Sequence, residues 1–358
     1  MTGLGTGGAD MAVVVALTSS GDVLVRNAIA VVEYLERQTV SPSLEVCLVA
    51  VAPPSAGDPA EPDPGAEDIR RALTPYESAF RSIAVVDPGP VHTVPEAVAA
   101  AVPRTEAPVV ALLEDHAFPA PDWAEGLLRA MQGPWTAVGC VMDNANPASA
   151  LSWANLLLAY GAWVGPRQPE ETDDIAAHNV AYRREVLTEL GAELVQALER
   201  GSTLHQRLRQ RGGRFFLSDV AVAHVNPSRL SSTVRLRFHA GRLFGAQRAA
   251  RNGWPTWRKL VYASAAAVIP GLRLWRTRHL LLPRTARDRS GPMLLPAVIL
   301  GLSCEAVGEA TGYLTGSGAS PEILEAFEFG RWRHLRPSDR EALLGAPAKL
   351  GAEGGPAH

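Results

Sequence analysis

An unbroken apolar segment that ends in charged residues constrains this chain more than any other feature. Residues 109–113 read Val-Val-Ala-Leu-Leu, and Glu114, Asp115 and His116 follow at once. A continuous apolar run bounded by turn residues indicates a strand buried on both faces, as in parallel sheets that helices cover. Open α/β sheets bind their ligands just beyond the carboxyl ends of such strands. Glu114 and Asp115 are therefore predicted to lie where the fold does its chemistry.

The two adjacent acids have a functional and a structural interpretation. Carboxylate oxygens are the hard ligands that suit Mg²⁺ or Mn²⁺ when the ion carries a phosphate-bearing substrate. Alternatively, Asp115 or Asp122 caps the helix that is expected to run through residues 125–128. Asp122 can serve as that cap by itself, which favours the metal role for Glu114 and Asp115.

Strands and helices alternate through the first part of the chain. Apolar runs predict strands at residues 11–17, 44–51 and 82–86, and helical periodicity predicts helices at 23–37, 67–80 and 95–102. This order is typical of an α/β fold with a mostly parallel sheet and helices on both faces. A glycine-rich segment at residues 3–8 precedes the first strand, whereas a phosphate-binding loop must follow one. Residues 1–10 are therefore expected to be a flexible leader.

Composition excludes several other classes of protein. The chain has 358 residues and a formal net charge of -3, which gives no general case for nucleic-acid binding. Its three cysteines, Cys47, Cys140 and Cys304, have no zinc-site spacing, and their odd number argues against a disulfide framework. The N-terminus lacks the basic-then-apolar order of a signal peptide. A reducing, cytosolic setting fits these observations.

The acidic segment also resembles a known motif. Leu113-Glu114-Asp115-His116, followed by Pro119-x-Pro121-Asp122-Trp123, resembles the Asp-x-Asp-type segment of family 2 glycosyltransferases. These GT-A enzymes bind a nucleotide-sugar through a divalent cation, so the resemblance implies Mn²⁺ or Mg²⁺ as cofactor. It implies Asp115 as a metal or diphosphate contact and Glu114 as a substrate contact near the ribose. His116 departs from the acidic third position that is common in the family.

Two later segments extend the resemblance. His178 and Asn179, followed by Tyr182-Arg183-Arg184, match a segment that sits against the sugar, which implies substrate contacts from His178, Asn179, Arg183 and Arg184. Family 2 enzymes also have a helix, a Gly-Gly turn and a strand that ends in a histidine, which this chain resembles with its basic helix, Gly212-Gly213 and a strand ending in His224. The resemblance implies His224 as a metal ligand. The alternatives are structural: the arginines can cap a helix or join surface ion pairs, and His224 can bond to the backbone.

The chain departs from the family at two further places. The second predicted strand continues as Ala50-Val51-Ala52-Pro53, without the acid that commonly contacts the nucleobase. Inverting sugar transfer also needs a carboxylate to take the proton of the acceptor hydroxyl. The family's Glu-Asp pair is replaced by Arg200-Gly201-Ser202-Thr203, so Glu199 and Asp174 become the candidate bases, with Asp173 as a further one. Glu199 can equally be an exposed helix end.

From Arg229 onward the chain is basic, with arginines interleaved among apolar residues. This pattern favours amphipathic helices on an anionic membrane surface. The apolar segments 260–274 and 293–302 are short for spanning helices, which need about 20 residues. Interfacial or re-entrant helices are therefore preferred, and a helical hairpin packed on the domain is the alternative.

These observations predict four regions. They are a leader at 1–10, a GT-A domain at 11–228 (nucleotide half 11–116, acceptor half 117–228), a membrane-associated helical region at 229–330 and a polar tail at 331–358 whose end is disordered. The leading hypothesis is an inverting glycosyltransferase at the cytoplasmic face of the membrane, with a nucleotide-sugar donor and a lipid-linked or cell-envelope glycan acceptor. Its rivals are a catalytically degenerate binding or scaffold protein and a nucleotidyltransferase, although the latter should carry a basic glycine-rich loop after the first strand.

Overall fold

The computed structural model of the chain describes residues 8–19, 22–52, 65–87, 89, 91–199, 201–276, 278 and 291–344. Residues 1–7 of the expected leader, residues 53–64 and the tail end at 346–358 lie outside the described residues. The chain divides into two compact units. The sheet unit comprises the chain up to Asp143 and Trp163–His224, and the helical unit comprises Asn144–Ala162 and Val225–Gly345. The helical unit thus includes the segment Asn144–Ala162, which precedes much of the sheet unit in the sequence. The four regions expected from the sequence stay predictions.

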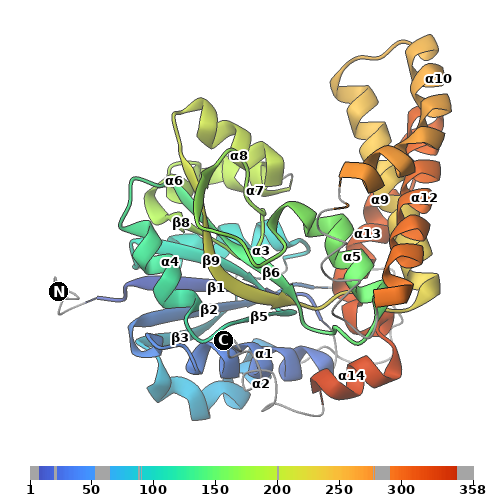
Figure 1. Cartoon of the computed structure of the whole chain (residues 1–358). Helices are drawn as coiled ribbons and strands as arrows, with labels where there is room; N and C mark the ends of the chain where they lie inside the picture. Colours follow the sequence, from blue (N-terminus) through green and yellow to red (C-terminus); the bar gives the residue numbers. More distant parts are fainter. Residues whose placement is uncertain are drawn as a thin grey trace. The chain divides into compact units, whose positions relative to one another are not determined.

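One half of the sheet is parallel, as the apolar runs predict. Its strands lie in the order β3-β2-β1-β4, and all neighbours pair in parallel. Every residue of β1 is buried, because helices cover both faces of the sheet. Figure 1 shows α1 and α2 on one face and α3 on the other. The bounds are β1 Met11–Leu17, α1 Asp22–Glu36, β2 Leu44–Ala50, α2 Ala66–Leu73, β3 Ser82–Val86, α3 Val94–Ala101 and β4 Val109–Glu114.

The other half of the sheet is antiparallel. Strand β8 runs antiparallel to both β4 and β6, and β9 runs antiparallel to both β5 and β7. The predicted α/β class with helices on both faces is confirmed, and the sheet is mixed, with parallel pairing in its first four strands. The bounds are β5 Ala117–Pro119, α4 Trp123–Met131, β6 Ala137–Asn144, β7 Glu170–Thr172, β8 Val180–Arg183, α6 Arg184–Thr188, α7 Leu194–Leu198, α8 Gly201–Gln210 and β9 Phe215–His224.

The helix expected at 67–80 is shorter than its apolar pattern suggests. The α-helix α2 ends at Leu73, and a 3-10 helix, Thr74–Ala79, takes its place with Pro75 in its first turn. Proline has no N–H to donate and its ring collides with the carbonyl four residues earlier, so an α-helix cannot pass through it undisturbed. The first turn of a new helix accepts proline without such a loss.

The helical unit is built on two long helices, α9 and α12, which lie side by side (Figure 1). Four glycines make this contact close, two from each helix at a spacing of four. A Cβ on Gly241 would lie 2.1 Å from the carbonyl oxygen of Glu305, and one on Gly308 would lie 2.0 Å from that of Phe238. Gly245 and Gly312 are equally tight against the opposite backbone. The bounds are α5 Ala150–Tyr160, α9 Leu230–Arg251, α10 Thr256–Ala265, α12 Gly291–Thr315, α13 Ser320–Phe329 and α14 Pro337–Leu344.

Charged residues lie buried between these helices. Arg237 of α9 pairs with Glu305 of α12 at 3.1 Å, and its guanidinium also donates to the side chain and the carbonyl of Asn155 in α5. Glu309, one turn further along α12, accepts from Tyr313 and lies 3.6 Å from Arg248. A buried charge is tolerated when it is paired and hydrogen-bonded. The acids of α12 therefore serve helix packing, and the helix continues past both of them to Thr315.

One described helix, Pro292–Thr315, is long and apolar enough to cross a membrane, with a mean hydropathy of 1.5. Half of that window is buried within the protein, which is also what a core helix shows. All large hydrophobic side chains that are exposed in the described residues belong to the helical unit, including Trp257, Trp275 and Val268.

Candidate metal centre

The charged turn after β4 lies at the carboxyl end of the parallel strands. Glu114 is the last residue of β4, Asp115 and His116 form a turn, and β5 begins at Ala117. Strand β9 pairs with β5 so that its last residue, His224, lies opposite Ala117. This register brings His224 next to His116, far away in the sequence. The ends of three strands thus deliver an acid and two histidines to one place.

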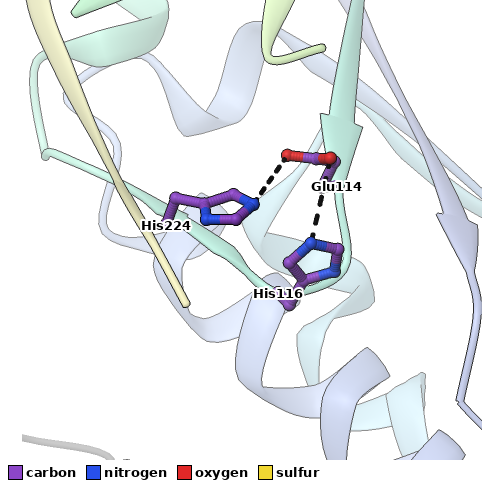
Figure 2. A group of neighbouring side chains, drawn as sticks. All are labelled: Glu114, His116 and His224. Atoms are coloured by element: carbon purple, nitrogen blue, oxygen red, sulfur yellow. Dashed lines mark ion pairs between the residues drawn. The ribbon is translucent and has the colours of Figure 1, made fainter. Parts of the chain in front are cut away.

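Glu114, His116 and His224 form a compact cluster in which the glutamate faces both imidazoles (Figure 2). The Nε2 atom of His224 lies 3.5 Å from one carboxylate oxygen of Glu114, and the Nε2 atom of His116 lies 3.8 Å from the other. The two rings meet edge to face with centroids 4.9 Å apart. One donor atom from each residue lies within 4.8 Å of the other two.

This donor set fits a divalent cation. Two ligand atoms that each lie ~2.1 Å from an ion, at right angles, are about 3 Å apart. The observed spacings of 3.5 and 3.8 Å need only small side-chain movements to reach that value. Two imidazoles and one carboxylate on the same side of an ion are also a known ligand set of transition-metal sites. Glu114, His116 and His224 are therefore the residues that would hold a metal ion here.

Asp115, expected to contact the metal, lies outside this cluster. Its carboxylate is 1% exposed, and it accepts hydrogen bonds from the Thr18 N–H at 2.7 Å and from the Thr18 hydroxyl. It also bonds to Nδ1 of His116 at 2.9 Å. In the turn between β4 and β5, His116 faces the cluster together with Glu114, whereas Asp115 faces Thr18 in the loop after β1. The geometry gives Asp115 a supporting position.

Asn179, expected to bond a sugar hydroxyl, has both ends of its amide engaged with Glu114. Its Oδ1 accepts the Glu114 N–H at 3.1 Å, and its Nδ2 donates to the Glu114 carboxylate at 2.8 Å. The side chain is fully buried and the backbone φ is 57°. The Cys140 thiol donates to the Asn179 carbonyl, and burial, the largest effect on that thiol, raises its pKa to about 12 and keeps it a donor. Asn179 therefore orients Glu114, and its contact with a sugar hydroxyl stays a prediction.

His178 is the predicted substrate contact that lies both close to the cluster and open to solvent. Its Nδ1 lies 3.9 Å from the Glu114 carboxylate, and 52% of its side chain is exposed. A half-exposed imidazole beside a metal centre can donate to an oxygen of an incoming ligand. Its position fits the role that the sequence suggests.

Arg183 and Arg184 lie at the other end of the sheet. Strand β8 runs antiparallel to β4, so its first residue, Val180, pairs with Leu112 while Arg183 pairs with Val109. The guanidinium of Arg183 donates to the carbonyls of Trp135, Met131 and Gly133. That of Arg184 donates to the Thr105 hydroxyl. Both side chains bond to loops at this end of the sheet, and their contact with substrate stays a prediction.

The two candidate bases are exposed and lie outside the cluster. Asp174 follows β7 with 68% of its side chain exposed, and its carboxylate lies 3.7 Å from Nδ1 of the buried His205. Glu199 is an exposed residue at the end of α7. Neither belongs to the group of possible metal ligands found in the described part of the chain. Their roles as bases stay predictions.

His116 is the functional residue that sequence reasoning undervalued. The sequence signal was a histidine directly beside two acids at the end of a buried strand, since imidazole is a common metal ligand. Because Asp115 and His116 lie in a turn, strand alternation does not predict which side each of them faces.

No protein-family model matches this chain, and no curated protein matches it in sequence. Among solved structures it is similar to the mannosyltransferase PcManGT from Pyrobaculum calidifontis in complex with GDP-Man and Mn²⁺, with 18% identity and a TM-score of 0.49 over 85% of this chain and 88% of that one. It is also similar to glucosyl-3-phosphoglycerate synthase from Mycobacterium tuberculosis in complex with phosphoglyceric acid, with 14% identity and a TM-score of 0.40 over 69% of this chain and 81% of that one. At such identities no residue here takes its role from these proteins.

Proposed function

We propose that this chain is a metal-dependent glycosyltransferase of the GT-A type, in family 2, which transfers a sugar from a nucleotide-sugar donor with inversion. The observation that carries the proposal is the cluster of Glu114, His116 and His224 at the carboxyl end of β4. Ligands of open α/β sheets bind at this edge, and a cation held there is suited to a diphosphate. The cofactor is Mn²⁺ or Mg²⁺, and the two imidazoles favour Mn²⁺.

Each residue near the centre has a defined task in this proposal. When bound, the cation would neutralise charge on the diphosphate and so favour departure of the nucleotide. Glu114 holds the ion from one side and is itself kept in place by Asn179. His178 donates a hydrogen bond to a donor oxygen. Asp174 or Glu199 takes the proton of the acceptor hydroxyl as the sugar is attacked.

The test is binding and turnover across a panel of nucleotide-sugars. Thermal unfolding of the wild type, with and without Mn²⁺, should show a stabilisation by at least one donor that depends on the metal. Glu114→Gln, which keeps the side-chain shape and removes the charge, should lose that stabilisation. Glu125→Gln, an exposed acid in α4, is the matched control and should retain it. Absence of any metal-dependent shift in the wild type would refute the proposal.

A binding or scaffold protein is the second candidate. It is favoured by the absence of an acid at the end of β2 and by the exposure of both candidate bases away from the cluster. The two candidates differ in turnover. Hydrolysis or transfer of the sugar, lost on Asp174→Asn or Glu199→Gln, supports the transferase. Metal-dependent donor binding without turnover, across a range of acceptors, supports the scaffold.

We further propose that the helical unit attaches to the cytoplasmic face of the cell membrane, where the acceptor is a lipid-linked or cell-envelope glycan. No acidic residue occurs between Asp219 and Asp288, whereas arginines recur throughout that interval. Exposed apolar side chains lie in the same part of the chain, with Trp257 and Trp275 among them. Cations with interfacial tryptophans suit an anionic bilayer surface.

Vesicle flotation tests this attachment. The protein should float with vesicles containing anionic lipid and bind less to neutral ones. Trp257→Ala with Trp275→Ala should reduce binding, whereas Trp135→Ala in the sheet unit is the control. Equal partitioning of the double variant and the wild type would contradict the attachment.

A further inference from the structure

We infer that Asp115 is a positioning residue, which holds the His116 imidazole so that its Nε2 atom faces the metal centre. The inference rests on the proposed metal centre and goes beyond it, because it concerns a residue that contacts neither the ion nor a substrate. It assigns Asp115 a role different from that of a direct ligand.

The hydrogen bond between the two neighbours determines which ring nitrogen is available. Oδ1 of Asp115 lies 2.9 Å from Nδ1 of His116, and a carboxylate can only accept. Nδ1 of a neutral imidazole must then carry the hydrogen, so Nε2 keeps its lone pair. Nε2 is the atom that lies 3.8 Å from the Glu114 carboxylate, on the side of the cluster. The bond to Asp115 therefore selects the tautomer and the ring orientation that metal binding needs.

Asp115 is itself fixed from the neighbouring strand. Thr18 follows β1 directly, and its N–H donates to Oδ2 of Asp115 at 2.7 Å. Its hydroxyl lies 3.1 Å from Oδ1 and 3.2 Å from Oδ2. Ala16 of β1 pairs with Glu114 of β4, which places Thr18 alongside the turn. The chain Thr18–Asp115–His116 thus anchors one metal ligand to the backbone of a second strand.

Asp115 neither caps a helix nor belongs to the set of possible metal ligands. The helix α4 begins at Trp123 with Asp122 as its N-cap residue, so Asp115 does not cap it. Asp115 is also absent from the group of side chains that could share an ion in the described part of the chain. A carboxylate that orients a metal-bound histidine is a common outer partner in metal sites, and its loss weakens metal binding about 10- to 100-fold.

Binding of Mn²⁺ to Asp115→Asn tests the inference, with free Mn²⁺ measured by electron paramagnetic resonance. We expect the dissociation constant to rise about 10-fold or more. Asp122→Asn, an acid a few residues along the same segment, is the matched control and should bind within about two-fold of wild type. Glu114→Gln removes a direct ligand and should bind more weakly than Asp115→Asn. Thr18→Val, which deletes the hydroxyl and keeps the N–H, should give a smaller loss.

The ring nitrogens of His116 report positioning directly. In protein labelled with ¹⁵N at its nine histidines, with His116→Gln to assign the signal, metal-free wild type should show His116 protonated at Nδ1. Asp115→Asn should shift the signal towards a mixture of tautomers, which a purely structural role would not do.

The outcomes separate this inference from the metal centre itself. If wild type binds no Mn²⁺, the proposed centre fails and the inference falls with it. If wild type binds Mn²⁺ and Asp115→Asn binds equally well with an unchanged His116 signal, the inference is wrong while the centre stands. If Asp115→Asn does not fold, Thr18→Val tests the inference instead, by its Mn²⁺ affinity and by its His116 ¹⁵N signal.

Discussion

The Asn179 side chain makes two hydrogen bonds to Glu114: it accepts the backbone N–H at 3.1 Å and donates to the carboxylate at 2.8 Å. Asn179 has a backbone φ of 57°, a conformation that asparagine adopts more readily than most residues. A single side chain therefore fixes both the end of β4 and the orientation of the acid that follows from it. The residue that orients Glu114 in the proposed metal centre thus has no solvent exposure.

Replacing Asn179 should separate the effect of its amide from the effect of its backbone. Asn179→Gly removes the amide and accepts the positive φ, whereas Asn179→Ala removes the amide and strains the backbone by about 1 kcal/mol. Both variants should bind Mn²⁺ about 10-fold more weakly, since Glu114 loses its orienting partner. Urea denaturation should find the alanine variant less stable than the glycine variant. Wild-type affinity in Asn179→Gly would show that Glu114 needs no such support.

The donor set should make the centre selective among divalent ions. Imidazole nitrogens suit transition metals, whereas Mg²⁺ prefers oxygen ligands and releases its waters reluctantly. We expect wild type to bind Mn²⁺ at least about 10-fold more tightly than Mg²⁺ in competition titrations. His224→Asp, which replaces a nitrogen ligand by an oxygen ligand, should reduce the preference for Mn²⁺ over Mg²⁺. A wild-type preference for Mg²⁺ would count against the assignment of His116 and His224 as ligands.

The glycine contact between α9 and α12 should not tolerate a methyl group. A Cβ on Gly308 would lie 2.0 Å from the carbonyl oxygen of Phe238, which belongs to a rigid helix backbone. Gly308→Ala is therefore expected to destabilise the helical unit by about 3 kcal/mol or more, measured by thermal unfolding. Gly271→Ala is the control because nothing lies within 4 Å of its added Cβ. That change should be neutral or stabilising by up to about 1 kcal/mol, as alanine favours helix. Equal effects of the two substitutions would disprove the close contact.

The helical unit should lose stability in mild acid because of His334. Burial, followed by the positive charge of Arg331, lowers the pKa of His334 from 6.5 to about 4. Between these values the unfolded chain takes up the proton before the folded chain does, so unfolding is favoured as pH falls. The contribution is complete above pH ~6.5 and decreases towards pH ~4. Urea denaturation at several pH values should show this slope.

His334→Gln supplies the comparison for that slope. Glutamine cannot take up a proton in this range, so the variant should lose less stability than wild type between pH 7 and pH 4.5. The expected difference is on the order of 1–2 kcal/mol, reduced from the full linkage value because the ring is half exposed. Parallel slopes for the two proteins would assign the acid sensitivity to other groups.

Local patterns in the sequence were sufficient for the parallel half of the sheet and for several helices. Residues 11–17 and 82–86 form strands as predicted, and the helix expected at 23–37 is α1. These elements are specified by runs of apolar residues and by turn residues beside them, and both signals are local. The exception at Pro75 is local too, since proline disfavours continuation of the α-helix that precedes it.

The glycines of the helical unit show where local information ends. Glycines at a spacing of four, such as Gly308 and Gly312, allow close contact between helices. No neighbouring residue identifies their partners, which are Gly241 and Gly245 on α9. Glu305 and Glu309 show the same limit, because the arginines that pair with them, Arg237 and Arg248, are distant in the sequence.

For the metal centre, the sequence by itself determined that acids and a histidine follow a buried strand and therefore lie at the ligand-binding edge of an α/β sheet. Only the tertiary structure decided which of them share the centre. The pairing of Ala117 with His224 brings the second imidazole to the cluster. Thr18 bonds to Asp115 and Asn179 bonds to Glu114, so the two acids belong to separate hydrogen-bond networks. Strand register and side-chain partners come from residues distant along the chain, so no local pattern contains them.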